Sequence, residues 1–126
     1  MREIKFKGQS VRGKKWHYGY FCKVNERQFI RENDGNDVWC INICQFTGLK
    51  DKNGKKIYEG DIVSDWEYID TYKIIWDRPM AMFSLERLTH SNDTEEDLSN
   101  SQFDFEVIGN IYENPELLIE KKVKPL

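Results

Sequence analysis

Three cysteines and two histidines supply the residue types that bind zinc most readily. The closest pair, Cys40 and Cys44, is separated by three residues inside the apolar run Val38–Phe46. Structural zinc sites usually carry tighter cysteine pairs on turns, so this spacing favours buried cysteines that pack as small hydrophobic side chains. The residues that would have to converge are Cys22, Cys40, Cys44, His17 and His90. We expect no zinc site.

Carboxylates are the second group that could do chemistry. The candidate cluster is Glu59, Asp61, Asp65 and Glu67. Such a cluster could hold Mg²⁺ as metal-dependent nucleases do, but carboxylates at period-two spacing more often form the solvated side of a strand. Asp51 opens a stretch similar to a calcium-binding loop, yet Gly54 comes too early and no glutamate follows at the required spacing. We predict no calcium site, and a magnesium-dependent nuclease is our weakest functional hypothesis.

Sequence motifs of the common enzyme classes are missing from the chain. It has no phosphate-binding glycine loop followed by Lys-Ser/Thr, no Gly-x-Ser-x-Gly, no His-Glu-x-x-His and no dinucleotide-binding fingerprint. Neither histidine lies in a recognisable nucleophile motif, so general-base catalysis has few candidates. We therefore expect a protein that is not an enzyme, with no catalytic residue, no cofactor and no resident metal.

Basic residues beside aromatic residues could bind nucleic acid, because cations hold phosphates and aromatic rings stack on bases. The candidate contacts are Arg12, Lys14, Lys15 and Trp16, followed later in the chain by Lys50, Lys52, Lys55 and Lys56. About seven cations acting together would make the affinity fall steeply with salt. A solvated hairpin with inward-facing aromatic rings is the structural alternative for the first group. The net charge of −3 also argues against nucleic acid, since free nucleic-acid-binding domains are usually basic.

Charge is distributed unevenly along the 126 residues. Residues 1–63 carry 13 Lys/Arg against 8 Asp/Glu, whereas residues 64–126 carry 6 against 14. Faces of opposite charge permit self-association or contact with a charged partner, and the alternative is that both faces are merely solvated. The odd number of cysteines, the lack of an apolar signal segment after Met1 and the lack of any run of roughly 18 apolar residues predict a reduced, cytoplasmic protein outside the membrane.

The elements that would position these residues are predicted mainly as strands. Alternating or β-branched apolar residues predict strands over 2–7, 16–24, 27–31, 38–46, 60–63, 72–76, 80–85 and from 103 to about 109–112. The run at 38–46 is nearly continuous, which is typical of a strand buried on both faces. Asn53-Gly54 predicts a hairpin with a type I′ turn, which needs a positive φ at both residues.

The other segments are predicted as turns, a loop and a helix. Turns are expected at 8–15 and 33–36, and an acidic loop at 90–102. Asn114-Pro115-Glu116 predicts a short helix, with Asn114 as the capping residue, Pro115 at the first helical position and Glu116 near the positive end of the helix dipole.

Three blocks in order carry a family resemblance. They are Met1–Phe6, the central block Thr47–Val63, and Val107–Leu118. Together they resemble the YopX family of small phage and prophage proteins. The resemblance implies a mostly β protein, carried on mobile genetic elements, whose C-terminal part is similar to an SH3-type barrel roll. It implies no established biochemical activity and therefore no catalytic residues.

Taken together, these patterns predict a mainly β fold, an SH3-type barrel roll with extra N-terminal strands and a short C-terminal helix. The predicted single domain, 1–126, consists of N-terminal strands (1–45), a barrel-like part (46–118) and a tail (119–126). We expect a binding module that acts as a homo-oligomer and through a protein partner. Nucleic-acid binding by an SH3-like barrel is the alternative.

Overall fold

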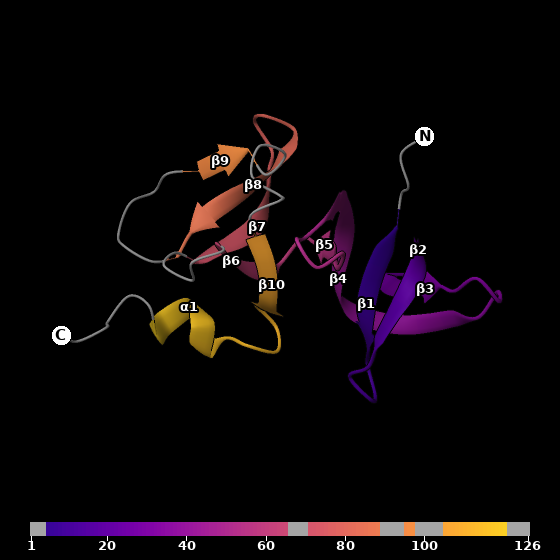
Figure 1. Cartoon of the computed structure of the whole chain (residues 1–126). Coiled ribbons are helices and arrows are strands. Elements are labelled where there is room, and N and C mark those ends of the chain that lie inside the picture. Colours follow the sequence, from indigo (N-terminus) through magenta and orange to yellow (C-terminus); the bar gives the residue numbers. More distant parts are fainter. Residues whose placement is uncertain (1–4, 66–70, 89–94, 98–104, 121–126) are drawn as a thin grey trace. The chain divides into compact units, whose positions relative to one another are not determined.

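The computed structural model describes residues 5–65, 71–88, 95–97 and 105–120 (Figure 1). Over these residues the fold is mainly β, with two antiparallel five-stranded sheets and one short helix. The chain divides into two compact units, Met1–Gly48 (unit 1) and Leu49–Leu126 (unit 2). A mainly β fold is therefore confirmed, whereas a single domain and an SH3-type barrel stay predictions.

Unit 1 is built from four strands that pair in a closed circuit. They are β1 (Phe6–Ser10), β2 (Trp16–Val24), β3 (Arg27–Arg31) and β4 (Asp37–Lys50), the last of which continues past the unit boundary. The antiparallel pairings are β1–β2, β2–β3, β3–β4 and β4–β1. The first half of β2 pairs with β1 and its second half with β3, so β2 has to change partners at Gly19–Tyr20.

Two glycines allow the close approaches that this circuit requires. A Cβ atom on Gly19 would overlap the carbonyl oxygen of Arg31, and one on Gly8 would lie 2.7 Å from Cδ1 of Ile43 and 2.9 Å from Cβ of Cys40. Gly8 therefore lies inside β1, which runs on to Ser10. The predicted turn over 8–15 was wrong in its first residues. The missing Cβ atom of Gly8 allows interior side chains to pack against β1, and the chain does not reverse direction there.

The strand β4 differs from its prediction in length and burial. It spans Asp37–Lys50, and its exposure alternates: Trp39 is 43% exposed whereas Cys40 is 1% exposed. The prediction of a strand buried on both faces was therefore wrong. At Asn42 the φ angle is 54°, next to a register shift in the β1–β4 pairing, so a bulge interrupts the apolar run.

The type I′ turn occurs at Asn25-Glu26, where no glycine is present. Both residues have a positive φ, 51° and 70°, and they connect the paired residues Val24 and Arg27. The hairpin predicted between 16–24 and 27–31 is thus confirmed, with strand bounds identical to those of β2 and β3.

The turn at Asn53-Gly54 reverses the chain as predicted, between β4 and β5 (Lys56–Tyr58), but the predicted turn type was wrong. Only Gly54 of the pair has a positive φ, 85°. The N–H of Asp51 donates to the carbonyl of Lys55 (2.8 Å) and the N–H of Gly54 to that of Asp51 (3.0 Å), which makes a three-residue loop. A type I turn followed by a left-handed glycine has this arrangement.

Unit 2 contains β5, five further strands and the helix. They are β6 (Asp61–Asp65), β7 (Thr71–Asp77), β8 (Met82–Arg87), β9 (Glu95–Asp97), β10 (Phe105–Asn110) and α1 (Glu116–Glu120). The five strands form a sheet of order β10-β6-β7-β8-β9. The hydrophobic core of unit 2 consists of Ile57, Val63, Tyr72, Ile74, Leu85 and Phe105.

Most strand predictions in unit 2 are confirmed. Strands predicted over 60–63, 72–76 and 103 onward correspond to β6, β7 and β10. Strand β8 begins at Met82 instead of Met80, because the preceding turn extends to Ala81, whose φ is 53°. The acidic loop predicted over 90–102 lies largely outside the described residues, and β9 falls within it.

The helix α1 begins directly after Pro115, as predicted. Asn114 does not cap it with its side chain: its Oδ1 atom accepts the N–H of Asn110 (3.1 Å). In return, Oδ1 of Asn110 accepts the N–H groups of Tyr112 and Glu113, both at 2.9 Å. The two asparagines thus close the loop between β10 and α1, because turn geometry uses the side-chain acceptor that a cap would have needed. Residues 121–126 of the predicted tail lie outside the described part.

In the parts of the chain that the structure describes, no helix has the length and apolar character needed to cross a membrane.

Candidate interaction surface

The first group of predicted nucleic-acid contacts lies on the β1–β2 loop. Arg12, Lys14 and Lys15 are exposed there. Ser10 fixes the loop, since its hydroxyl oxygen accepts the N–H of Lys15 (3.1 Å) and its carbonyl accepts the N–H of Lys14 (3.1 Å). Trp16 is half-buried, and the Lys7 ammonium lies 4.3 Å from its ring centroid. The three cations are therefore gathered on one loop. The Trp16 ring is in contact with the ammonium group of Lys7.

The second group surrounds the β4–β5 turn. Lys50, Lys52 and Lys55 are exposed and Lys56 is half-buried. The Lys52 ammonium lies 3.7 Å from Oε1 of Glu106, a separation that adds little stability at a partly exposed position. Lys50 ends β4, and the other three lysines follow it in the turn and at the start of β5. The two groups of predicted contacts therefore lie on different loops.

Several of the residues considered for metal binding are buried or hydrogen-bonded in the described structure. The Asp61 carboxylate is 2% exposed and accepts the N–H of Tyr58 (2.8 Å). Cys40 and Cys44 are buried in the interior, and burial raises the pKa of the Cys40 thiol. His90 and Glu67 lie outside the described residues. Among the described residues, no group of three or more His, Cys, Asp and Glu side chains could hold a metal ion.

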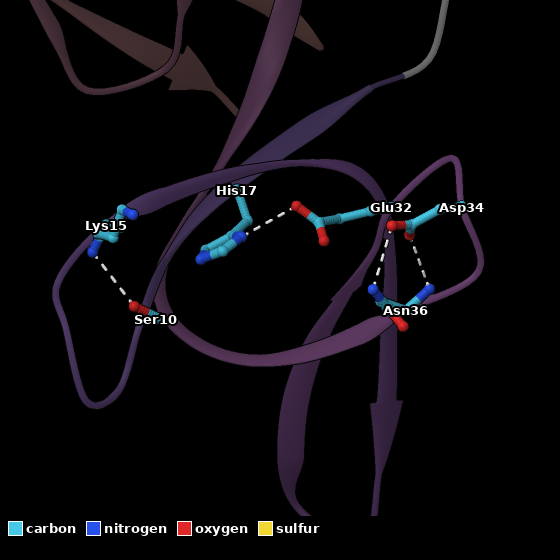
Figure 2. Close-up of polar contacts among 6 residues, drawn as sticks. All are labelled: Ser10, Lys15, His17, Glu32, Asp34 and Asn36. Atoms are coloured by element: carbon cyan, nitrogen blue, oxygen red, sulfur yellow. Dashed lines mark hydrogen bonds and ion pairs between the residues drawn. The ribbon is translucent and has the colours of Figure 1, made fainter.

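His17 and Glu32 form a pair that the sequence analysis did not identify (Figure 2). The Nδ1 atom of His17, on β2, lies 2.9 Å from Oε2 of Glu32, which begins the β3–β4 loop. Asp34 and Asn36 brace that loop through two hydrogen bonds of 3.0 and 3.1 Å. The two residues are 15 positions apart in sequence, and their contact connects β2 to the loop. We therefore interpret the pair as a structural contact that fixes the loop to the strand.

Exposed apolar side chains gather on one face of β2, β3 and β4. Residues directly opposite one another in an antiparallel pair point to the same face. The register therefore aligns Tyr20 with Arg31 and Asp37, Cys22 with Phe29 and Trp39, and Val24 with Arg27. We call these eight residues the aromatic face. Its most exposed apolar members are Tyr20 (64%), Val24 (55%) and Trp39 (43%).

Two arginines of the aromatic face are held by neighbouring side chains. The guanidinium of Arg27 lies 4.6 Å from the ring centroid of Trp39. Arg31 donates to both carboxylate oxygens of Asp37, from Nε at 2.7 Å and from a terminal nitrogen at 3.0 Å. This hydrogen bonding lowers the pKa of Asp37 and raises that of Arg31. The face thus presents apolar area together with oriented cations, the composition typical of protein contact surfaces.

Sequence analysis missed this face because its members come from three strands. Basic and aromatic neighbours in sequence indicated Arg12–Trp16 instead. The alternation of Tyr20, Cys22 and Val24 with their neighbours gives a period-two signal for one side of β2. Which residues of β3 and β4 lie opposite them depends on strand register, which the turns determine.

A second exposed apolar feature lies at the end of the β7–β8 hairpin in unit 2. Trp76 is 42% exposed and packs edge-on against Phe83, with ring centroids 4.8 Å apart. Met80 is 63% exposed, and its N–H donates to Asp77 in the turn (3.3 Å). We call Trp76–Met80 the hairpin tip.

A family model described as YopX protein matches residues 2–119. The chain belongs to the YopX family. No curated protein matches it. Among solved structures it is similar to the crystal structure of protein EF1440 from Enterococcus faecalis, with 24% identity and a TM-score of 0.57 over 94% of this chain and 99% of that chain. At this identity the likeness concerns the fold alone.

In this YopX-family chain the central block has a structural role. The Asp51 carboxylate is 7% exposed and accepts three backbone N–H groups, from Asn53, Lys55 and Val107, each at 2.9 Å. The N–H of Lys52 donates to the carbonyl of Phe105 (2.9 Å). The turn therefore covers backbone groups of β10, which is the end strand in the order of its sheet.

Proposed function

We propose that this YopX-family protein is a non-enzymatic binding module that acts through self-association and through a protein partner. The observation that supports the proposal is the aromatic face, on which Tyr20, Val24 and Trp39 expose apolar area from an ordered sheet. Large exposed aromatic side chains bordered by arginine are enriched at protein interfaces and often dominate their binding energy.

The charges of the two units support contact between copies. Unit 1 carries 9 Lys/Arg and 5 Asp/Glu, a net charge of +4. Unit 2 carries 10 and 17, a net charge of −7. Opposite charges on different units of the same chain attract between copies and accelerate their encounter, and salt screens this attraction.

Size-exclusion chromatography with light scattering at low and high salt tests self-association. We expect a mass above that of the 15.1 kDa chain at low salt, which decreases at high salt. The variant Tyr20→Ser should shift the assembly towards the monomer, because it removes the most exposed ring of the aromatic face. A monomer at both salt concentrations, at high protein concentration, would remove self-association from the proposal.

Nucleic-acid binding is the second candidate function. It is favoured by the exposure of Arg12, Lys14 and Lys15 on one loop that Ser10 fixes. Fluorescence anisotropy with short duplex and single-stranded probes at low salt tests it, with Lys14→Gln and Lys15→Gln as the variants expected to weaken binding. The lack of any binding at micromolar protein would eliminate this candidate.

The setting that we infer from the family resemblance is a phage or prophage genome, with the protein in the cytoplasm of the host cell. An SH3-type roll in residues 46–118 is part of the same proposal. Capture of partners from host cells, followed by separate assays for protein and for nucleic acid, would distinguish the two candidate functions.

A further inference from the structure

Within the described residues, each unit of the chain exposes an apolar feature to which several side chains contribute. Unit 1 exposes the aromatic face, and unit 2 exposes the hairpin tip with Trp76 and Met80. Methionine is unbranched and makes favourable contacts with aromatic rings, so Met80 is suited to pack against Tyr20 or Trp39 on such a face. The two features are therefore complementary in chemistry as well as in the net charge of the units that carry them.

We propose that the hairpin tip of one copy docks on the aromatic face of a second copy. This inference rests on the self-association proposed above and specifies its two surfaces. The contact is heterologous, since it joins different surfaces of the two copies. In this contact the first copy still has an unused aromatic face and the second copy an unused hairpin tip, so the same contact can add further copies.

Charge favours this pairing over a symmetric one. In a symmetric contact, the aromatic face would meet a second aromatic face, and Arg27 and the rest of a unit of net charge +4 would oppose their own copy. In the heterologous contact that unit meets one of net charge −7. Like charges across an interface disfavour association, whereas complementary potentials stabilise it.

Mixing two variants of the full chain tests the inference. Tyr20→Glu alters the aromatic face and leaves the tip intact, whereas Met80→Glu alters the tip and leaves the face intact. Each variant alone should self-associate about tenfold or more weakly than the wild type, because each loses a central, exposed contact. A mixture should form a 1:1 dimer, in which the tip of the first variant docks on the face of the second.

Matched controls are Asn33→Glu in unit 1 and Asn53→Glu in unit 2, both at exposed loop positions outside the two surfaces and with the same change in charge. Both should associate like the wild type. Native mass spectrometry of the mixture gives its stoichiometry, and circular dichroism verifies that each variant is folded. If Tyr20→Glu does not fold, Arg27→Glu replaces it as the variant of the face.

The outcomes separate this inference from the proposed function. A 1:1 dimer in the mixture supports tip-to-face docking. A wild type that assembles while the mixture stays monomeric, or a variant that assembles as the wild type does, overturns the inference but leaves self-association intact. A wild type that is monomeric at every salt concentration contradicts both.

Discussion

Glu26 occupies a backbone conformation that glutamate rarely adopts. Its φ of 70° lies in the left-handed region, which costs a non-glycine residue roughly 1–2 kcal/mol. Glu26→Gly should therefore raise the free energy of unfolding by about 0.5 kcal/mol, after the greater backbone entropy of glycine in the unfolded chain is subtracted. Urea denaturation measures this change.

Glu26→Ala is the matched control for that substitution. Alanine retains the Cβ atom and should gain nothing, and the loss of the exposed Lys23–Glu26 ion pair, at 3.9 Å, should cost little in either variant. A gain in stability that is equal for glycine and alanine would show that backbone strain is not the cause.

Cys40 should make the stability of the fold depend on pH in the alkaline range. Burial raises the pKa of its thiol above the ordinary value of about 8.5. A group whose pKa is raised by folding contributes stability below its unfolded pKa and loses it as the pH rises through the folded value. The wild type should therefore lose more stability than Cys40→Ala between neutral pH and about pH 10.

Urea denaturation under reducing conditions at both pH values measures this difference. Cys22→Ala, at a half-buried position, is the control and should follow the wild type. Parallel loss of stability in the wild type and in Cys40→Ala would contradict a raised pKa at this position.

At the scale of elements, the β4–β5 turn depends on the Asp51 carboxylate. Asp51→Ala leaves three N–H groups without their acceptor, including that of Val107 on β10. Hydrogen bonds to a charged group contribute about 1.5–3 kcal/mol, and a buried unsatisfied donor adds a cost. We expect a loss of about 3 kcal/mol in the free energy of unfolding.

The control for Asp51 is Asp34→Ala in the loop between β3 and β4, where the carboxylate is exposed and accepts bonds from Asn36. Amide hydrogen exchange at Val107 gives a second measurement, since its N–H should lose protection in Asp51→Ala alone. Equal losses of stability in the two variants would contradict the role given to Asp51.

The closed circuit of unit 1 depends on Gly19. Gly19→Ala places a Cβ atom against the carbonyl group of Arg31, a backbone group that cannot move aside as a side chain can. We expect a loss of about 3 kcal/mol or more, at the upper end of overpacking costs. Gly13→Ala is the control, because its nearest neighbour would lie at 3.6 Å. Thermal denaturation followed by circular dichroism compares the two, and similar melting temperatures would contradict the close approach.

Most elements could be predicted from sequence, and their details could not. The bounds of β2 and β3 follow from apolar alternation and a two-residue polar break. The turn types could not be predicted, because Asn53-Gly54 fits both two-residue and three-residue hairpin loops. The hydrogen bond from the N–H of Asp51 to the carbonyl of Lys55 selects the three-residue loop. Gly8 was interpreted as a turn residue because a glycine that permits close packing looks the same in sequence.

At the scale of the whole molecule, the uneven charge persists when it is counted by compact unit. Counted over residues 1–63 and 64–126, the net charges are +5 and −8, but the first segment mixes residues of both units. Counted by unit they are +4 and −7, each on a compact body of its own. The charges can therefore act between copies as properties of separate surfaces.

The far-ultraviolet circular dichroism spectrum provides the corresponding check on the fold. Because the described residues form ten strands and one helix of five residues, we expect a spectrum dominated by strands. A spectrum dominated by helix would contradict the architecture and both proposed surfaces.

By itself, the sequence determined that the protein is mainly β, where most of its strands run and which family it resembles, because alternation and turn residues act over a few neighbours. Only the tertiary structure decided that Tyr20, Phe29 and Trp39 share one exposed face, and that Asp51 bonds to an amide 56 residues away. The physical reason is that strand register and the path of the chain bring distant residues together, and neither is encoded in the spacing of any one segment.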